Sequence, residues 1–358
     1  MPPPFGPFFG RAGGWTVTGG SGPGTTPDEP VRVTAERLEK NLTKFGYFLS
    51  CEEFGPNELL EQAKMAEAAG FEALWISDHF HPWNDEQGES PFVWSVIGGL
   101  SQATSLPVTT SVTCPTVRIH PAIIAQAAAT SKVMLNGRFS LGIGTGEALN
   151  EHIFGDAWPS TDVRLEMLEE AVEVMRLLWK GGTRDHEGRH YTVENARLYT
   201  LPEEPPDVLI SGFGPKAIEL AARIGDGYCG VEPDPETVEM YRSSGGDGKP
   251  AHAGTKVCWS EDEAAARENA LRLWPNEALP GELAQVLPTP RHFEQATQLV
   301  TEEMMDQSFT CGPDPEKHLQ QLQSYAEAGY DEVYVQQIGP EQEGFFRFYE
   351  SEILPKLR

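Results

Sequence analysis

Apolar segments of strand length alternate with helical patterns along most of this chain of 358 residues. Such segments cover residues 45–49, 72–77, 107–112, 138–143, 207–210, 227–231, 254–259 and 331–336. Strand-helix alternation is typical of an α/β fold with a parallel sheet, because the helices serve as crossover connections. Eight strands predict a closed (β/α)8 barrel, the TIM-barrel fold, and an open doubly wound sheet is the alternative.

Helix signals support this alternation. The clearest helical patterns cover residues 57–69, 121–135, 163–179 and 319–328. Gly70 and Gly329 follow two of them, as expected of helix ends, because glycine adopts the left-handed conformation that ends a helix. Pro121 begins another, where its missing N–H costs nothing.

Three stretches fall outside the alternation. Residues 186–199 predict a hairpin with Glu187-Gly188 at its turn, and residues 275–307 form an acidic, lid-like insertion. Residues 1–30 contain 8 Gly and 7 Pro, which predicts a flexible tail. The sequence therefore predicts a single barrel domain over residues 31–358 behind that tail.

Charge and composition narrow the function classes. With 27 Lys and Arg against 54 Asp and Glu, the formal net charge is −27, which disfavours nucleic acid and anionic membranes as partners. No apolar run reaches the ~20 residues of a membrane span, and no secretory signal is visible. Five widely spaced cysteines without a Cys-x-x-Cys motif indicate a reducing cytoplasm.

The second predicted strand ends in a reactive group of side chains, Asp78-His79-Phe80-His81-Pro82-Trp83. Catalytic residues of barrel enzymes lie at the carboxyl ends of strands, and histidine titrates near neutral pH. His79 is therefore the candidate general base. A surface histidine beside a helix-capping Asp78 is the plainer alternative. The spacing of other potential ligands disfavours a metal site here.

Three other strand ends carry small or polar residues. After residues 138–143 the chain reads Gly144-Thr145-Gly146-Glu147 and then Asn150, where the glycines would let the backbone approach a flat ring. Glu147 occupies the third glycine position of the dinucleotide fingerprint, so that motif is not present. The other two strand ends supply candidate cofactor-binding residues: Ser111, Val112, Cys114, Ser211, Gly212, Phe213 and Gly214.

From about Phe45 to Arg358, the chain resembles the coenzyme F420-dependent glucose-6-phosphate dehydrogenase family of the luciferase-like superfamily. The matching motifs are Ser77-Asp78-His79-Phe80 with Pro82-Trp83, Thr110-Ser111-Val112, and residues 144–151, with weaker matches at Gly212-x-Gly214-Pro215 and Gly225-Asp226-Gly227. The resemblance implies a homodimeric (β/α)8 barrel that binds a deazaflavin at the strand ends.

Carried over residue by residue, the resemblance implies roles for individual side chains. His79 would take a proton from a substrate hydroxyl, Glu147 would protonate the reduced ring, and Trp83 would shape the charge near the reacting carbon. Asp78, Ser111, Val112, Glu147 and Asn150 match cofactor-contacting positions, with Cys114, Gly146 and residues 211–214 beside them. The Ser111–Val112 peptide is often cis in this family.

The expected phosphate ligands of the substrate are missing. Glu232 and Asp234 stand in the loop where the resemblance implies lysine, and Arg291 is the only lysine or arginine between Leu273 and Glu316. The resemblance also implies a histidine near the active site, and the chain has glutamine there, at about Gln285. We therefore expect an alcohol or sugar dehydrogenase whose substrate needs no phosphate.

Some choices remain open from the sequence. Arg118 and Lys216 are candidates for contacting the anionic cofactor tail. An FMN-dependent monooxygenase and a non-catalytic deazaflavin-binding protein are the alternative functions.

Overall fold

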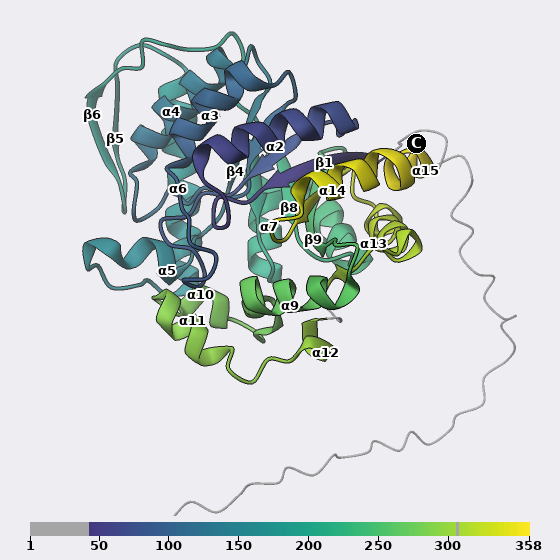
Figure 1. The fold of residues 1–358 in the computed structure, drawn as a ribbon. Coiled ribbons are helices and arrows are strands. Elements are labelled where there is room, and N and C mark those ends of the chain that lie inside the picture. The colour runs from purple at the N-terminus through teal and green to yellow at the C-terminus, as the bar shows by residue number, and fades with distance from the viewer. Residues whose placement is uncertain (1–42, 306–307) are drawn as a thin grey trace, which may run out of the picture. The chain divides into compact units, whose positions relative to one another are not determined.

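The computed structural model describes residues 43–305 and 308–358. Its central element is a closed barrel of eight parallel strands (Figure 1). The strands are β1 (Lys44–Leu49), β2 (Leu74–Ile76), β3 (Val108–Thr110), β4 (Phe139–Ile143), β7 (Val208–Ser211), β8 (Gly227–Gly230), β9 (Ala251–Cys258) and β11 (Glu332–Gln337). They follow one another in the order β9-β11-β1-β2-β3-β4-β7-β8, and β8 pairs with β9 to close the barrel. The predicted TIM barrel is confirmed, and the open sheet was the wrong alternative.

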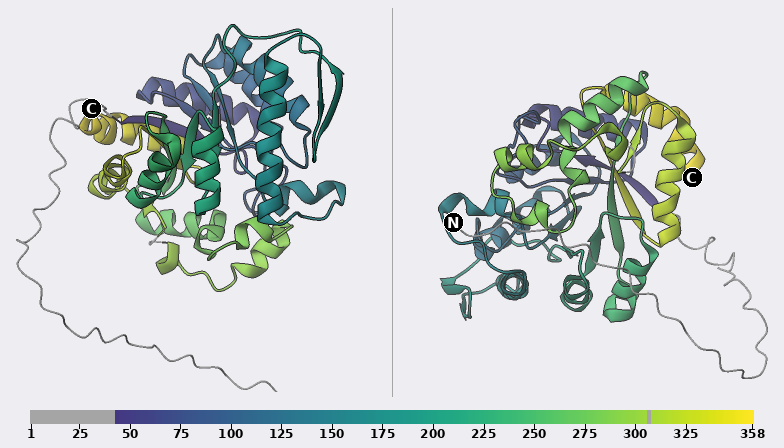
Figure 2. Two further views of the ribbon diagram at one scale, coloured as in Figure 1. Left: turned by 180° about the vertical axis from the view of Figure 1, so that it is seen from behind. Right: turned by 90° about the horizontal axis from the view of Figure 1, so that it is seen from below.

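Helices surround the barrel, as the views in Figure 2 show. The four helices with clear sequence signals are α2 (Pro56–Ala69), α4 (Pro121–Met134), α6 (Thr161–Trp179) and α13 (Pro315–Ala328). The rest are α3 (Val93–Ala103), α5 (Ala148–Glu151), η1 (His152–Phe154), α7 (Pro215–Ile224), α8 (Pro235–Tyr241), η2 (Arg242–Gly246), α9 (Glu263–Leu273), α14 (Gln342–Phe348), η4 (Tyr349–Ile353) and α15 (Leu354–Leu357). Gly70 and Gly329 end α2 and α13 with φ of 96° and 99°, confirming both predicted helix ends.

Both predicted additions are present. The hairpin consists of β5 (Arg184–Glu187) and β6 (Thr192–Ala196), which pair antiparallel. The insertion after α9 contains η3 (Pro275–Ala278), α10 (Leu283–Val286), α11 (Pro290–Ala296) and α12 (Glu302–Met305), followed by β10 (Thr310–Cys311). In Figure 1, α10, α11 and α12 lie along the lower part of the fold, and α5 lies above them at the left. The predicted tail, residues 1–30, lies outside the described residues, as does the start of the predicted domain.

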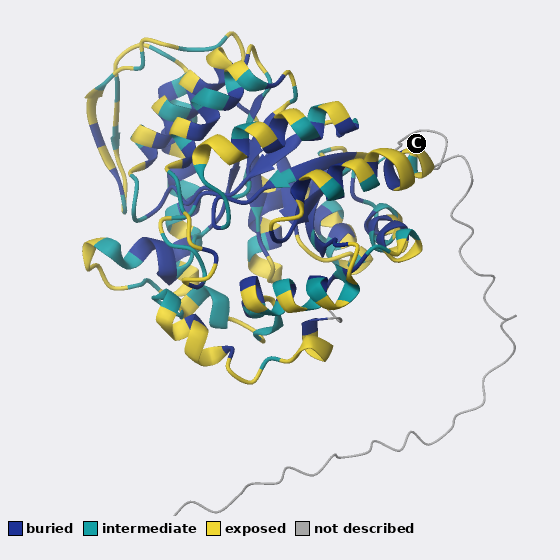
Figure 3. Ribbon diagram, in the orientation of Figure 1, coloured by how far each residue is buried: buried dark blue, intermediate teal, exposed yellow. Residues whose placement is uncertain are grey.

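Two apolar layers hold the barrel together. The larger lies between the strands and the helices, and its strand members alternate along each strand with side chains that point into the barrel. Inside the barrel, Trp75 stacks on Tyr334 with ring centroids 4.4 Å apart, and Leu209 and Cys229 belong to the same cluster. Figure 3 shows this burial as dark blue strands beneath helices with exposed outer faces. The barrel interior is therefore packed below its carboxyl end.

Candidate active site

His79 lies where β2 ends and is held from two sides. Its Nε2 is 3.4 Å from Oε1 of Glu52, which follows β1, and its Nδ1 is 3.1 Å from the carbonyl oxygen of His81. The Glu52 carboxylate accepts hydrogen bonds from the hydroxyls of Ser50 at 2.8 Å and Ser77 at 2.7 Å. A carboxylate fixed in this way stabilises an imidazolium, so the arrangement suits a histidine that accepts a proton.

Asn150 of α5 connects His79 to Glu147. Its Oδ1 accepts hydrogen bonds from the backbone N–H groups of Phe80 at 2.8 Å and His81 at 3.1 Å. Its Nδ2 is 3.2 Å from Nδ1 of His79 and donates to Oε2 of Glu147 at 3.3 Å. Asn150 is buried, so these bonds fix the loop after β2 against the loop after β4. The predicted residues His79, Glu147 and Asn150 therefore share one hydrogen-bonded group.

Trp83 packs beside this group and beneath the insertion. Its ring centroid is 5.0 Å from that of His79, and it meets Phe293 of α11 edge-on at 5.1 Å. Gln87 accepts a hydrogen bond from the Trp83 backbone N–H at 2.8 Å. The insertion thus contacts the predicted catalytic tryptophan, although its motion as a lid stays a prediction.

Asp78, Arg118 and Glu151 form a buried ionic cluster. Arg118 Nη2 is 2.9 Å from Oδ1 of Asp78, and its Nε is 3.4 Å from Oε1 of Glu151. Only 6% of the arginine side chain and 1% of each carboxylate side chain are exposed. Thr113 donates to Oδ2 of Asp78 at 2.8 Å, and burial raises the pKa of Glu151 to about 7. Both ion pairs engage the Arg118 guanidinium inside the protein, and its contact with a cofactor tail stays a prediction.

The ends of β3, β4 and β7 meet at Gly144. A Cβ atom on Gly144 would lie 2.9 Å from Cγ2 of Val112 and 3.8 Å from Cβ of Ser211. The Ser111–Val112 peptide is cis, as the family resemblance implied. These three strand ends therefore bring together Gly144 and the predicted cofactor-binding residues Ser111, Val112 and Ser211.

Cys114 and Gly146 also lie against each other. Gly146 has φ of +77°, and a Cβ atom there would lie 2.6 Å from Sγ of Cys114. Cys114 is buried, its Sγ is 3.0 Å from Oγ1 of Thr116, and burial raises the pKa of its thiol. Only glycine fits at position 146 without strain. Contact of Cys114 with a cofactor stays a prediction.

The loop after β7 presents glycine backbone and one aromatic side chain. The Gly212 carbonyl accepts a hydrogen bond from the Tyr228 hydroxyl at 2.8 Å, and Phe213 is 59% exposed. Gly214 precedes the first turn of α7, and a Cβ atom there would meet no atom within 4 Å. Lys216, in that turn, is exposed and pairs with Asp162 at 2.7 Å. The open N-terminus of α7 suits an anionic group.

Two residues of this region, Glu52 and Lys256, were not predicted from the sequence. Glu52 follows the first predicted strand, so the strand-end rule that identified His79 would have found it. Lys256 lies inside a predicted strand and points into the barrel mouth; the alternation of residues 252–258 was the only available signal.

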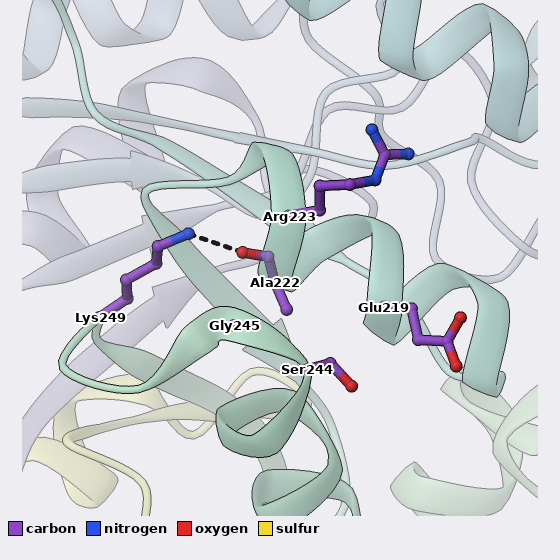
Figure 4. Close-up of a pocket in the computed structure, with 6 residues that line it drawn as sticks. All are labelled: Glu219, Ala222, Arg223, Ser244, Gly245 and Lys249. Carbon is purple, nitrogen blue, oxygen red and sulfur yellow. Dashed lines mark hydrogen bonds between the residues drawn. The ribbon is translucent and has the colours of Figure 1, made fainter.

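Some features of the described residues carry no site. No group of three or more His, Cys, Asp or Glu side chains within residues 43–305 and 308–358 could hold a metal ion. A surface pocket at the C-terminal end of α7 is lined by Glu219, Ala222, Arg223, Ser244, Gly245 and Lys249 (Figure 4). Its Lys249 donates to the carbonyls of Ala222 and Gly225, so it caps the helix. This pocket lies at the opposite end of the barrel from His79, since helices run antiparallel to strands here.

Within the described chain, no helix is both long and apolar enough to cross a bilayer.

The chain also resembles proteins of known family. Residues 42–332 match the family model described as luciferase-like monooxygenase. An F420-dependent glucose-6-phosphate dehydrogenase of Microbacterium testaceum is 36% identical over 330 residues, covering 88% of this chain and 97% of the relative. An enzyme of the same name from Rhodococcus jostii is 34% identical, covering 88% and 99%.

A solved structure extends this comparison. An F420-dependent secondary alcohol dehydrogenase in complex with an F420-acetone adduct superposes with a TM-score of 0.82 at 31% identity, covering 88% of this chain and 99% of that one. Barrel and strand-end residues together define the class, a (β/α)8-barrel oxidoreductase. The chain belongs to the luciferase-like monooxygenase family.

Proposed function

We propose that this chain is a dehydrogenase that transfers a hydride from a secondary alcohol or sugar hemiacetal to coenzyme F420. The observation that carries the proposal is the bonded group Glu52–His79–Asn150–Glu147 at the carboxyl end of the barrel. F420-dependent relatives at 31–36% identity over nearly their whole length support the cofactor. When bound, F420 supplies a deazaflavin ring that accepts a hydride.

The strand ends fit a flat ring and an anionic tail. Val112, Gly144 and Ser211 line the meeting point of β3, β4 and β7, where glycine removes side-chain bulk. Ser111, Cys114, Gly146 and Asn150 would lie beside the ring, and Asp78 holds the end of β3 through its hydrogen bond from Thr113. Gly212, Phe213 and Gly214, just before α7, would receive the tail. Binding as a homodimer stays a prediction of the family resemblance.

His79 accepts the substrate proton in this proposal. With Nδ1 protonated and donating to the His81 carbonyl, Nε2 keeps its lone pair for the hydroxyl proton. Glu52, 3.4 Å from Nε2, stabilises the imidazolium that results. Asn150 orients His79 by accepting hydrogen bonds from the backbone N–H groups of Phe80 and His81 and orients Glu147 by donating to it, and Glu147 supplies a proton from its carboxyl group. Trp83 restricts the imidazole on the side of the insertion.

Substitution of the base tests this assignment. His79→Ala is expected to lower turnover of an alcohol that the wild-type protein oxidises by about 100- to 10,000-fold while F420 affinity survives. His81→Ala is the matched control, because that ring bonds the Leu149 carbonyl at 2.9 Å instead of Glu52. Turnover of the His79 variant within about ten-fold of wild type would reject the base assignment.

A further inference from the structure

Lys256 is the one cation on the barrel strands near their carboxyl ends. Among the described strands of the barrel, only Lys44 and Lys256 are lysines or arginines, and Lys44 begins β1 at the other end. Residues of β9 alternate, and a Cβ atom on Gly254 would lie 2.8 Å from the Trp75 ring inside the barrel. Two residues further, Lys256 therefore points into the barrel mouth.

A carboxylate of the insertion neutralises this lysine. Nζ of Lys256 is 3.1 Å from Oε1 of Glu277 in η3 and lies 4.6 Å from the ring centroid of Trp274. The Lys256 side chain is 19% exposed and that of Glu277 is 32% exposed, so water and ligands can reach the pair. Glu277 thus occupies the position that an anionic substrate group would take beside Lys256.

Contacts connect this pair to the catalytic histidine. Trp274 donates its Nε1–H to Oε1 of Glu53 at 2.6 Å, and Gln336 Nε2 donates to the same oxygen at 3.3 Å. Glu53 directly follows Glu52, the carboxylate beside His79. Burial raises the pKa of Glu53 to about 7. One ammonium and two carboxyl groups therefore share this region, which has no net positive charge.

The strand order separates this region from the cofactor-binding residues. β3, β4 and β7 follow β2 on one side and carry the glycines and the cis peptide, whereas β1, β11 and β9 lie on the other side. Because His79 follows β2, it stands between the two halves. A substrate that meets both His79 and the ring occupies the β1-β11-β9 half.

We propose that Lys256 binds hydroxyl groups of the substrate, and that Glu277 determines specificity by neutralising Lys256. The substrate class is an uncharged, hydroxyl-bearing alcohol or sugar, and its phosphate ester is rejected. A phosphate dianion would have to displace Glu277 and face Glu53, and both changes oppose binding. The substrate class in this inference rests on the proposed function, whereas the effect of Glu277 on anion binding at Lys256 does not.

Two measurements test the proposal. The first is the kcat/KM ratio for glucose and glucose-6-phosphate with F420, together with a secondary alcohol. Glu277→Gln is expected to raise the relative kcat/KM of the phosphate ester at least about ten-fold, because Lys256 loses its internal partner. Lys256→Met is expected to raise KM for the neutral substrate with little change in kcat. Glu302→Gln in α12 is the control, since it removes the same charge from an exposed position of the insertion.

The second measurement needs no turnover. Isothermal titration with inorganic phosphate is expected to show binding to the Glu277→Gln protein at least about ten-fold tighter than to wild type, and no gain in the Lys256→Met/Glu277→Gln protein. Equal gains in Glu277→Gln and Glu302→Gln, or a wild-type preference for the phosphate ester, would overturn the proposal. If wild type oxidises no alcohol with F420, the proposed function fails, while the phosphate titration still decides the role of Glu277.

Discussion

Replacing Arg118 by methionine is expected to destabilise the protein by about 3–5 kcal/mol at pH 8. The guanidinium lies 2.9 Å from Asp78 and 3.4 Å from Glu151, and each of those carboxylate side chains is only 1% exposed. Methionine fills a similar volume but leaves both carboxylates buried without a cation. An uncompensated buried charge costs far more than a lost surface pair, so the penalty is large.

The loss is expected to depend on pH in a defined direction. Burial already raises the pKa of Glu151 to about 7 with Arg118 present. Without Arg118, protonation can neutralise the carboxylates, so the variant loses less stability at pH 6 than at pH 8. Urea unfolding followed by tryptophan fluorescence at both pH values measures this difference.

A matched surface pair provides the control. Lys216→Met breaks the exposed ion pair with Asp162 and is expected to change the free energy of unfolding far less than Arg118→Met does, because solvent screens an exposed pair. If the two variants are equally stable at pH 8, the buried cluster does not hold the barrel mouth as described.

Three further changes give separate tests. Gly146→Ala is expected to cost about 1–3 kcal/mol in urea unfolding, because φ is +77° and the new Cβ would lie 2.6 Å from Cys114, while Gly214→Ala costs less. Burial raises the pKa of Glu53 from 4.5 to about 7. Its contribution to stability is therefore present below pH 4.5 and is lost as the pH rises to about 7. Glu53→Gln removes this pH dependence, which amounts to up to about 3 kcal/mol in the free energy of unfolding. Asn150→Ala is expected to lower turnover of the same substrate by about 10- to 100-fold, because the backbone of Phe80 and His81 that positions His79 loses its partner. A smaller effect would deny Asn150 that role.

The barrel could be predicted because its signals are local. Each strand is buried on both faces and reads as a short apolar run, and glycines such as Gly70 and Gly329 mark helix ends. Helices α3 and α9 were not predicted, because neither has a clear apolar stripe. Val93–Ala103 (α3) is apolar on most faces, and Glu263–Leu273 (α9) consists mainly of charged residues and alanine. Tertiary packing decides such segments more than their own periodicity.

The sequence predicted which residues form the site better than it predicted their hydrogen-bond and ion-pair partners. His79, Asn150 and Glu147 were identified at strand ends, and the structure joins them by hydrogen bonds. The pairing of Arg118 with two carboxylates and of Lys256 with Glu277 depends on contacts between segments far apart in the chain. Position along the sequence gives the charge of a side chain, whereas the fold decides which opposite charge meets it.

Cofactor choice followed by reduction in the same cuvette tests the central proposal most directly. Under anaerobic conditions the protein is titrated with F420 and, separately, with FMN, and a secondary alcohol or sugar is then added. The expected result is fluorescence quenching by F420 at lower concentrations than by FMN, followed by loss of the oxidised deazaflavin absorbance that His79→Ala slows. Tight FMN binding without F420 binding, or F420 binding without reduction by any alcohol or sugar, would contradict an F420-dependent dehydrogenase.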